Sequence, residues 1–591
     1  MSPNRPFLVA AFLSASSLVH AEDATPDNAP IAATAQTPLS ESLNPVTDAP
    51  LVSELPAQQA AAPSSNVTVN LIGRLVQKGI LTQAEAIVLV QQAEADAATA
   101  AQNNVLPPNA DDTRVSYIPE VVRNNMRDQI KQELMATAHE EKWSEKSSPD
   151  WTSKFRPFGD IRGRYESTVF PQGNDNTGAF PNFNAINTGA PFDVSGNQFS
   201  PQYNVDQDRQ RTRLRARLGT EIMLGDSFNG GIRLATGDSN SPTSPNQTLG
   251  GSGGNFSKYA IWLDRAFLSY DAGPGDGQEL VFLMGRFDNP FFSTDIQWDD
   301  DLGFDGLAVR GKVRLNDQVS SFFSAGYFPV FNTDFNFASN QPAKFSSTDK
   351  WLSGGQFGIE WKMTDELTAK FGVAYYDFNN IEGKLSTPFI PLAPSDAGNT
   401  DSTRPGFAQR GNTYMALRDI DNTTSANAFG TKYQYQYYGL ASQFRNLTIT
   451  GKIDYDHFDP VRVSLIGEAT KNLAFEKGDV AGRAVNNFGA AYDGGDTAWN
   501  LTFLVGKPAL EAFGDWQASF GYRYVESDAV VDGFTDSDFG GGGTNVQGYT
   551  LGANMALSRA VRCGLRWMSS DEIIGSPLST DTFQFDINAK F

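Results

Sequence analysis

The chain has 591 residues, 12% aromatic residues and a formal net charge of −22 at pH 7. This charge argues against nucleic acid as a partner, and a single cysteine, Cys563, excludes an internal disulfide. Only His139 and His457 remain after the first 21 residues, so a histidine-rich metal site is not expected. We predict that the protein is not an enzyme, with no catalytic residues, no metal and no cofactor.

The first 21 residues are typical of a secretory signal peptide. Arg5 supplies the positive charge, residues 7–18 form the apolar run, and Val19, His20 and Ala21 form a small-residue cleavage pattern. The alternative is a membrane-spanning helix, which needs about 20 apolar residues, and this run is shorter. We expect cleavage after Ala21 and export of the mature chain.

Residues 22–65 are rich in Ala, Pro, Ser and Thr, which predicts a disordered tether. Residues 66–145 are predicted to form a helical periplasmic segment. Within it, Thr82 and Glu85 form a capping box that begins the second helix of a hairpin.

An amphipathic helix is predicted at the end of this segment, over residues 120–141. Pro119 occupies its first turn, and its apolar residues are spaced four apart. Two interpretations remain open. In the first, the helix packs on its own hairpin or plugs the floor of a barrel formed by the residues that follow. In the second, it self-associates in the periplasm.

From about residue 155 the apolar period changes to two. Ile161 and Tyr165 alternate with Arg162 and Arg164, as expected of a strand with one apolar and one polar face. The pattern gives 16 segments, near 155–166, 209–222, 228–237, 261–271, 280–288, 305–315, 318–328, 351–363, 367–378, 444–456, 461–472, 498–506, 515–526, 546–558, 560–570 and 581–591.

The connections between these segments alternate between short polar turns, such as 224–227 and 315–318, and long Gly/Asn/Ser-rich loops, such as 379–431. An even strand number with this rhythm predicts an all-β transmembrane fold over residues 155–591. The predicted fold is a 16-stranded antiparallel up-and-down β-barrel, preceded by the short α-helical segment. A tyrosine-rich run at 433–438 leaves 18 strands as the alternative.

The arginines decide which face of each strand meets water. An arginine near the bilayer midplane costs roughly 2–4 kcal/mol, so a ladder of them in one strand must line an aqueous lumen. The predicted pore-lining basic residues are Arg162, Arg164, Arg209, Arg211, Arg213, Arg215, Arg217, Arg233, Arg265, Arg286 and Arg310.

An acidic connection lies between two of the predicted strands, at 286–306. We expect residues 289–303 to fold into the lumen and face the arginines across a constriction. The alternatives are a solvated loop or an external site for divalent cations. The predicted constriction residues are Asp295, Asp299, Asp300, Asp301 and Asp305.

The last strand alternates strictly and ends on an aromatic residue. It resembles the C-terminal strand signature of bacterial outer-membrane barrels, which implies recognition by the barrel assembly machinery. The residues that would carry this signal are Phe583, Phe585, Ile587 and Phe591.

Five stretches resemble the "putative porin" family of Gram-negative outer-membrane proteins: IPEVVRNNMRDQIKQEL (118–134), FRPFGDIRGRYE (155–166), RTRLRARLG (211–219), LDRAFLSY (263–270) and GRFDNPF…WDDDLGFDG (285–306). The resemblance implies a bacterial outer-membrane location, contact with lipid and lipopolysaccharide, and a helical segment in the periplasm. It also implies passive diffusion of small hydrophilic solutes, and the basic lumen favours charged ones. A trimer is expected by analogy with general porins.

Other functions fit the sequence less well. A barrel phospholipase or protease needs a general base, and the one barrel histidine, His457, sits in a predicted periplasmic turn. A gated receptor would need 22 strands and a folded plug. The alternative kept open is an outer-membrane structural anchor or adhesin whose helical segment contacts the cell wall.

Overall fold

The structure is a computed structural model. It describes residues 152–189, 201–251, 253–273, 275, 278–333, 348–393, 395–421, 435–485 and 492–591, together with 75–76, 78, 82, 84–89, 91–92 and 95. The chain divides into two units, Met1–Glu120 and Val121–Phe591. The predicted signal peptide, the tether and the 120–141 helix lie outside the described residues.

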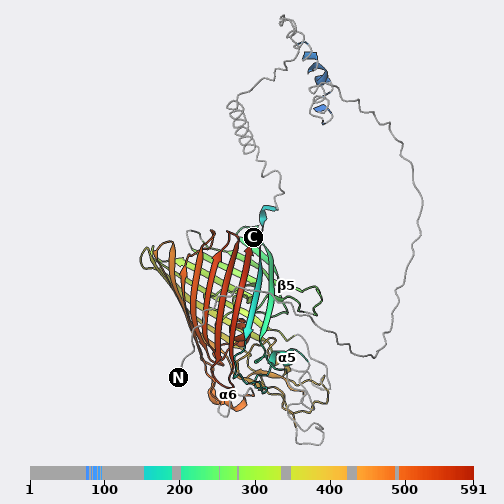
Figure 1. Cartoon of the computed structure of the whole chain (residues 1–591), viewed down its shortest axis with the longest axis vertical. Coiled ribbons are helices and arrows are strands. Elements are labelled where there is room, and N and C mark those ends of the chain that lie inside the picture. Colours follow the sequence, from blue (N-terminus) through green and yellow to red (C-terminus); the bar gives the residue numbers. More distant parts are fainter. Residues whose placement is uncertain are drawn as a thin grey trace, which may run out of the picture. The chain divides into compact units, whose positions relative to one another are not determined.

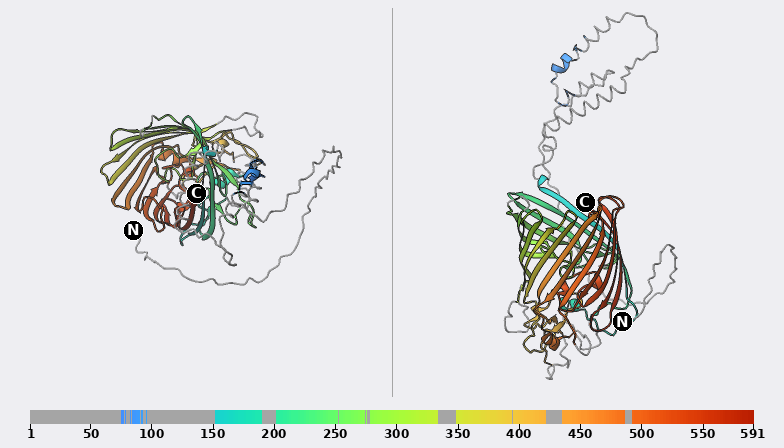
Figure 2. Two further views of the ribbon diagram at one scale, coloured as in Figure 1. Left: turned by 90° about the horizontal axis from the view of Figure 1, so that it is seen from above. Right: turned by 90° about the vertical axis from the view of Figure 1, so that its left-hand side faces the viewer.

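The second unit is a closed antiparallel barrel of 16 strands (Figures 1 and 2), which confirms the predicted fold class. The barrel strands are β1 (Phe155–Val169), β2 (Arg209–Gly225), β3 (Phe228–Thr236), β5 (Ile261–Asp271), β6 (Glu279–Asp288), β7 (Gly303–Arg314), β8 (Val319–Phe331), β9 (Lys350–Lys362), β10 (Leu367–Asn379), β13 (Arg445–Phe458), β14 (Val461–Asn472), β15 (Thr497–Gly506), β16 (Trp516–Val525), β17 (Val546–Ala556), β18 (Val561–Glu572) and β19 (Ser579–Lys590).

The remaining elements are short and lie in or beside the connections. They are β4 (Gln247–Thr248), β11 (Tyr414–Ala416), β12 (Tyr438–Leu440), α5 (Phe183–Thr188), α6 (Lys477–Arg483), η1 (Thr152–Lys154), η2 (Asp401–Thr403), η3 (Asp532–Phe534) and η4 (Phe539–Gly541). The tyrosine-rich run ends in β12, which pairs with β11 outside the barrel, so the 18-strand alternative does not apply.

The two faces of the strands differ as the alternation predicts. On β19, Phe585 is 37% exposed whereas its neighbour Gln584 is 1% exposed. On β2, Leu218 is 58% exposed and Arg215 is 8% exposed. Apolar side chains therefore form the outer surface, which suits lipid, and polar side chains point into the barrel.

The connections divide into a turn end and a loop end. At the turn end the chain reverses within a few residues, as where Leu315 N–H donates to the carbonyl of Val319 at 2.9 Å and Leu557 N–H to that of Val561 at 2.8 Å. The long loops gather at the other end, which carries α5 and α6 in Figure 1. No helix among the residues that the structure describes is long and apolar enough to cross a bilayer.

The barrel closes where β1 meets β19. Gly159 N–H donates to the carbonyl of Phe591 at 2.9 Å, and Phe591 N–H donates back at 3.1 Å. A Cβ on Gly159 would lie 2.5 Å from the Phe591 ring and 2.7 Å from the backbone oxygen of Arg217. The C-terminal aromatic therefore occupies the space that this glycine leaves open.

Gly159→Val is expected to weaken this closure, because its side chain collides with a ring on one side and backbone on the other. Overpacking of this kind costs typically about 1–3 kcal/mol. The measurement is the temperature at which the barrel loses its heat-modifiable migration in SDS gels. Gly163→Val, whose Cβ would meet open space, is the matched control. Equal melting of the two variants would contradict this packing.

In the first unit, the predicted capping box is confirmed. Thr82 N–H donates to Glu85 Oε2 at 2.8 Å, and Glu85 N–H donates to Thr82 Oγ1 at 3.4 Å. Residues 84–89 are helical, so the box satisfies donors at the start of that helix.

Candidate functional site: the charged lumen

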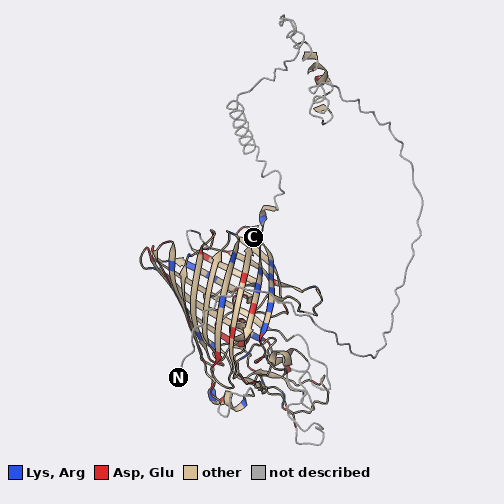
Figure 3. Ribbon diagram, in the orientation of Figure 1, with Lys and Arg blue, Asp and Glu red and all other residues tan. Residues whose placement is uncertain are grey.

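The arginines of β2 share two carboxylates of β1 on the inner face of the barrel, and Figure 3 shows charges of both signs on these neighbouring strands. The ion pairs are Arg211–Glu166 at 2.5 Å, Arg213–Glu166 at 3.5 Å, Arg215–Asp160 at 2.9 Å and Arg217–Asp160 at 2.7 Å. Each carboxylate separates two like charges, which relieves the repulsion expected of an arginine ladder. Arg209, at the end of β2, is exposed.

The β1 arginines differ in their partners. Arg164 is 1% exposed and lies 2.7 Å from both Asp586 of β19 and Asp538 of the 526–545 loop. Arg162 forms no ion pair in the described part of the chain, and its Nη2 donates to Asn246 Oδ1. The arginines that β1 and β2 present to the inner face are thus mostly buried, and most of them pair with carboxylates.

The 289–302 loop places part of its acidic cluster against the basic wall. Asp301 lies 3.1 Å from Arg217 and 3.5 Å from Arg215, and Asp295 lies 2.7 Å from Arg523 of β16. These contacts reach inward-facing side chains of β2 and β16, which are five strands apart around the barrel, so the loop lies inside the barrel.

The other three predicted acids of this segment are placed differently. Asp299 is buried and its carboxylate accepts the N–H groups of Asp301 at 2.8 Å and Ser537 at 3.1 Å. Asp300 is exposed. Asp305 lies outside the loop, in β7, where it pairs with Arg286 at 2.7 Å. The expectation that Asp305 belongs to the loop is corrected, because the strand begins at Gly303.

A second loop, 526–545, enters the lumen and was not predicted to do so. Its Asp536 lies 3.0 Å from Arg523, and the Asp536 N–H donates to the Asp295 carbonyl at 3.0 Å. Asp299 N–H donates to the carbonyl of Phe534 at 2.8 Å. We call the contact of Asp295 and Asp536 with Arg523 the loop latch, because it joins both loops to one wall residue.

The 380–444 loop holds the 526–545 loop from the loop end. Gln409 Nε2 donates to the carbonyls of Asp532 at 2.8 Å and Thr535 at 2.9 Å. Asn412 Nδ2 donates to the carbonyls of Ser527 at 2.6 Å and Val530 at 2.8 Å. A side-chain amide thus satisfies backbone groups that would otherwise be buried without partners.

Burial raises the pKa of Asp532 to about 7, although the Tyr414 hydroxyl donates to its carboxylate at 2.8 Å and lowers the pKa. The unfolded pKa is about 3.9. Below that value the carboxyl is neutral in both states, and its contribution to loop packing is fully present. This contribution is lost as pH rises through about 7, because the carboxyl then ionises and burial of the packed loop disfavours its charged form.

Loop packing is therefore expected to loosen between about pH 4 and 7, and less so in Asp532→Asn. Limited proteolysis of the 526–545 loop across this range measures the change. Asp528, whose pKa burial also raises, remains in both proteins, so only the difference between them reports on Asp532. Identical pH profiles would contradict the assignment.

The remaining predicted basic residues lie on β3, β5, β6 and β7. Arg233 and Arg265 both contact Asp264 and Asp288, and Arg265 also donates to the carbonyls of Asp301 and Leu302 of the 289–302 loop. Arg310 of β7 is exposed and forms no ion pair with the described residues.

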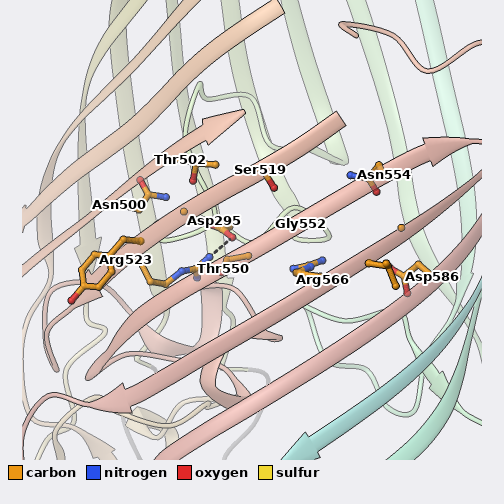
Figure 4. A pocket seen from close by; sticks show the side chains of 14 residues that line it. Asp295, Asn500, Thr502, Ser519, Arg523, Thr550, Gly552, Asn554, Arg566 and Asp586 are labelled. Carbon is orange, nitrogen blue, oxygen red and sulfur yellow. Dashed lines mark hydrogen bonds and ion pairs between the residues drawn. The ribbon is translucent and has the colours of Figure 1, made fainter. Parts of the chain in front are cut away.

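A cavity of about 280 Å³ lies along the inner face of β15, β16, β17 and β18 (Figure 4). Its uncharged amide and aliphatic hydroxyl side chains are Asn500, Thr502, Ser519, Thr550 and Asn554. We call this surface the polar lane. Arg566 lies on the same surface with a side chain 36% exposed, and its nearest ion-pair partner, Asp538, is 3.7 Å away.

Sequence reasoning placed none of these five uncharged residues in the site, because isolated Asn, Ser and Thr residues carry no motif. The described ranges hold no group of three or more His, Cys, Asp or Glu residues that could bind a metal ion.

The comparison with protein families agrees with this architecture. The model of the family described as "Putative porin" matches residues 65–591. No curated protein matches the chain.

Among solved structures, the chain is similar to the outer membrane channel DcaP of Acinetobacter baumannii, with 12% identity, 74% of this chain and 97% of that chain covered, and a TM-score of 0.34. It is also similar to OprB of Pseudomonas putida, with 11% identity, 74% and 95% covered, and a TM-score of 0.39. An anion-selective porin from Comamonas acidovorans is 12% identical to the chain, with 74% of this chain and 99% of that chain covered and a TM-score of 0.33.

The family match spans most of the chain, including the whole described barrel. The protein therefore belongs to the "Putative porin" family and is an outer-membrane channel protein.

Proposed function

We propose that the barrel is a passive diffusion channel for small hydrophilic, charged solutes, with its turn end and N-terminal segment in the periplasm. The observation that carries the proposal is the polar lane, a cavity lined by amide, hydroxyl and charged groups inside a wall whose outer face is apolar. Such groups replace part of a solute's hydration while it passes.

In the proposed channel, ion pairs between the arginine ladder and the 289–302 loop form a fixed structure around the constriction. Because Asp160, Glu166 and Asp301 neutralise much of the ladder, its main effect is to hold the inward loop. Selectivity then depends on the cations that lack a close carboxylate.

Arg310 and Arg566 are accessible arginines of the inner wall that meet this description. Arg310 is exposed without an ion pair in the described part of the chain, and Arg566 has only a partner 3.7 Å away. Fixed positive charges in a narrow aqueous passage attract anions and repel cations. We therefore propose a preference for anionic solutes.

Swelling of proteoliposomes tests passage directly. Vesicles that contain the purified protein are expected to swell in isotonic monosaccharide and in small organic salts, and not in large oligosaccharides. Absence of swelling with every small solute would contradict diffusion through the lumen and favour the anchor alternative.

A further inference from the structure

A second cavity, of about 410 Å³, lies at the loop end of the barrel. It is bounded by the ends of β7, β8 and β9 and by the 289–302, 380–444 and 526–545 loops. Its ring side chains are Trp298, Phe304, Phe328, Phe331, Phe407 and Phe534. A cavity of this size with a mainly apolar lining and a few polar groups is typical of small-molecule sites. We call it the aromatic vestibule.

The aromatic vestibule contains a buried lysine with no ion-pair partner among the residues that the structure describes. Lys350 lines the cavity and is 1% exposed. Its Nζ donates to the carbonyls of Thr403 at 2.8 Å and Arg404 at 2.7 Å, and the described residues supply no carboxylate within ion-pair distance of it. Burial without a carboxylate disfavours the charged form of a lysine, and carbonyl groups alone do not compensate the ammonium charge. An anion in the cavity would supply that compensation.

A second cation on the cavity wall is accessible. The side chain of Arg286 is 29% exposed and lies 2.7 Å from Asp305, which is 50% exposed. Arg286 Nε donates to the carbonyl of Asp264 at 3.0 Å. A guanidinium has five donors, so this pair leaves donors for an incoming carboxylate, with which Asp305 would compete. The ionisable side chains that line the vestibule are thus two basic ones, Arg286 and Lys350, and one acidic one, Asp305.

We infer that the aromatic vestibule binds small organic anions with an apolar ring, namely aromatic or alicyclic carboxylates. The ring packs against the aromatic walls, and the carboxylate accepts hydrogen bonds from Arg286 in the positive field of Lys350. The inference deepens the proposed function because it names a class of solute that would collect at the loop end before passage. Binding itself does not require conduction.

Calorimetric titration of the full-length protein in detergent tests the inference with three probes: benzoate, benzyl alcohol and acetate. Benzoate is expected to bind more tightly than either of the others, since benzyl alcohol lacks the charge and acetate lacks the ring. This comparison needs no variant. Equal binding of benzoate and benzyl alcohol would overturn the role of the cations.

Two substitutions are expected to act in opposite directions. Arg286→Gln removes a charge-assisted hydrogen bond and should weaken benzoate binding about tenfold. Asp305→Asn removes the competing carboxylate and should strengthen it. Shifts of both variants in the same direction would contradict the assignment, because they would report general damage to the wall.

Phe407→Ala should weaken benzoate and benzyl alcohol alike, since Phe407 lines the vestibule. Phe389→Ala, in the same loop but outside the cavity lining, is the matched control and should change neither. Heat-modifiable migration verifies that each variant is a folded barrel. Conductance without benzoate binding overturns this inference alone, and binding without conductance overturns only the proposed function.

Discussion

Arg523→Gln is expected to release both inward loops and to give a larger, noisier single-channel conductance. The guanidinium of Arg523 lies between Asp295 at 2.7 Å and Asp536 at 3.0 Å, with a side chain 13% exposed. Removing one partner of a buried ion pair costs about 3–5 kcal/mol. That cost corresponds to roughly a 100-fold or greater shift in the ratio of latched to released loops.

The matched control for the loop latch is Arg462→Gln. Arg462 also pairs closely with a carboxylate, Asp456 at 2.6 Å, but it lies near the turn end, away from both inward loops. Its conductance should equal that of the wild type. If Arg523→Gln also conducts like the wild type while its barrel remains folded, then the latch does not restrict the lumen.

The double variant Arg310→Gln/Arg566→Gln is expected to shift ion preference from anions toward cations. Both arginines are accessible on the inner wall and lack a close carboxylate, so their charge acts on passing ions with little compensation. A unit charge acts on an ion 7 Å away with about 0.6 kcal/mol in bulk water, and with several times that in a narrow pore. The reversal potential under a KCl gradient measures the shift.

Arg215→Gln is the comparison for this prediction. Arg215 is 8% exposed and shares Asp160 and Asp301 with Arg217, so its substitution should move the reversal potential less than the double variant does. A larger shift in reversal potential for Arg215→Gln than for the double variant would mean that the arginine ladder lines the narrowest part of the lumen. This result would contradict the proposal that carboxylates neutralise the ladder.

The strands could be predicted from the sequence because their signal is local. Alternation of Ile161 and Tyr165 with Arg162 and Arg164 gives both the strand and its orientation, and the cost of an arginine in lipid selects the inner face. The run at 433–438 was ambiguous because a short strand outside the barrel has the same local composition as one within it.

The inward position of the 526–545 loop could not be predicted in the same way. Asp536 and Asp538 stand in a Gly-rich acidic loop, which is the composition of a solvated connection. Their partners Arg523 and Arg164 lie on different strands, and only the closed barrel brings them together. Neutralisation of the ladder depends on such long-range pairs, so sequence alone overstated the accessible charge of the wall.

The most direct test of the channel account is planar-bilayer recording of the purified wild-type protein under a KCl gradient. Stable ohmic steps with a reversal potential on the anion-selective side are expected. Stable insertion of folded barrels without current steps would contradict the account and leave a structural anchor as the function of this outer-membrane protein.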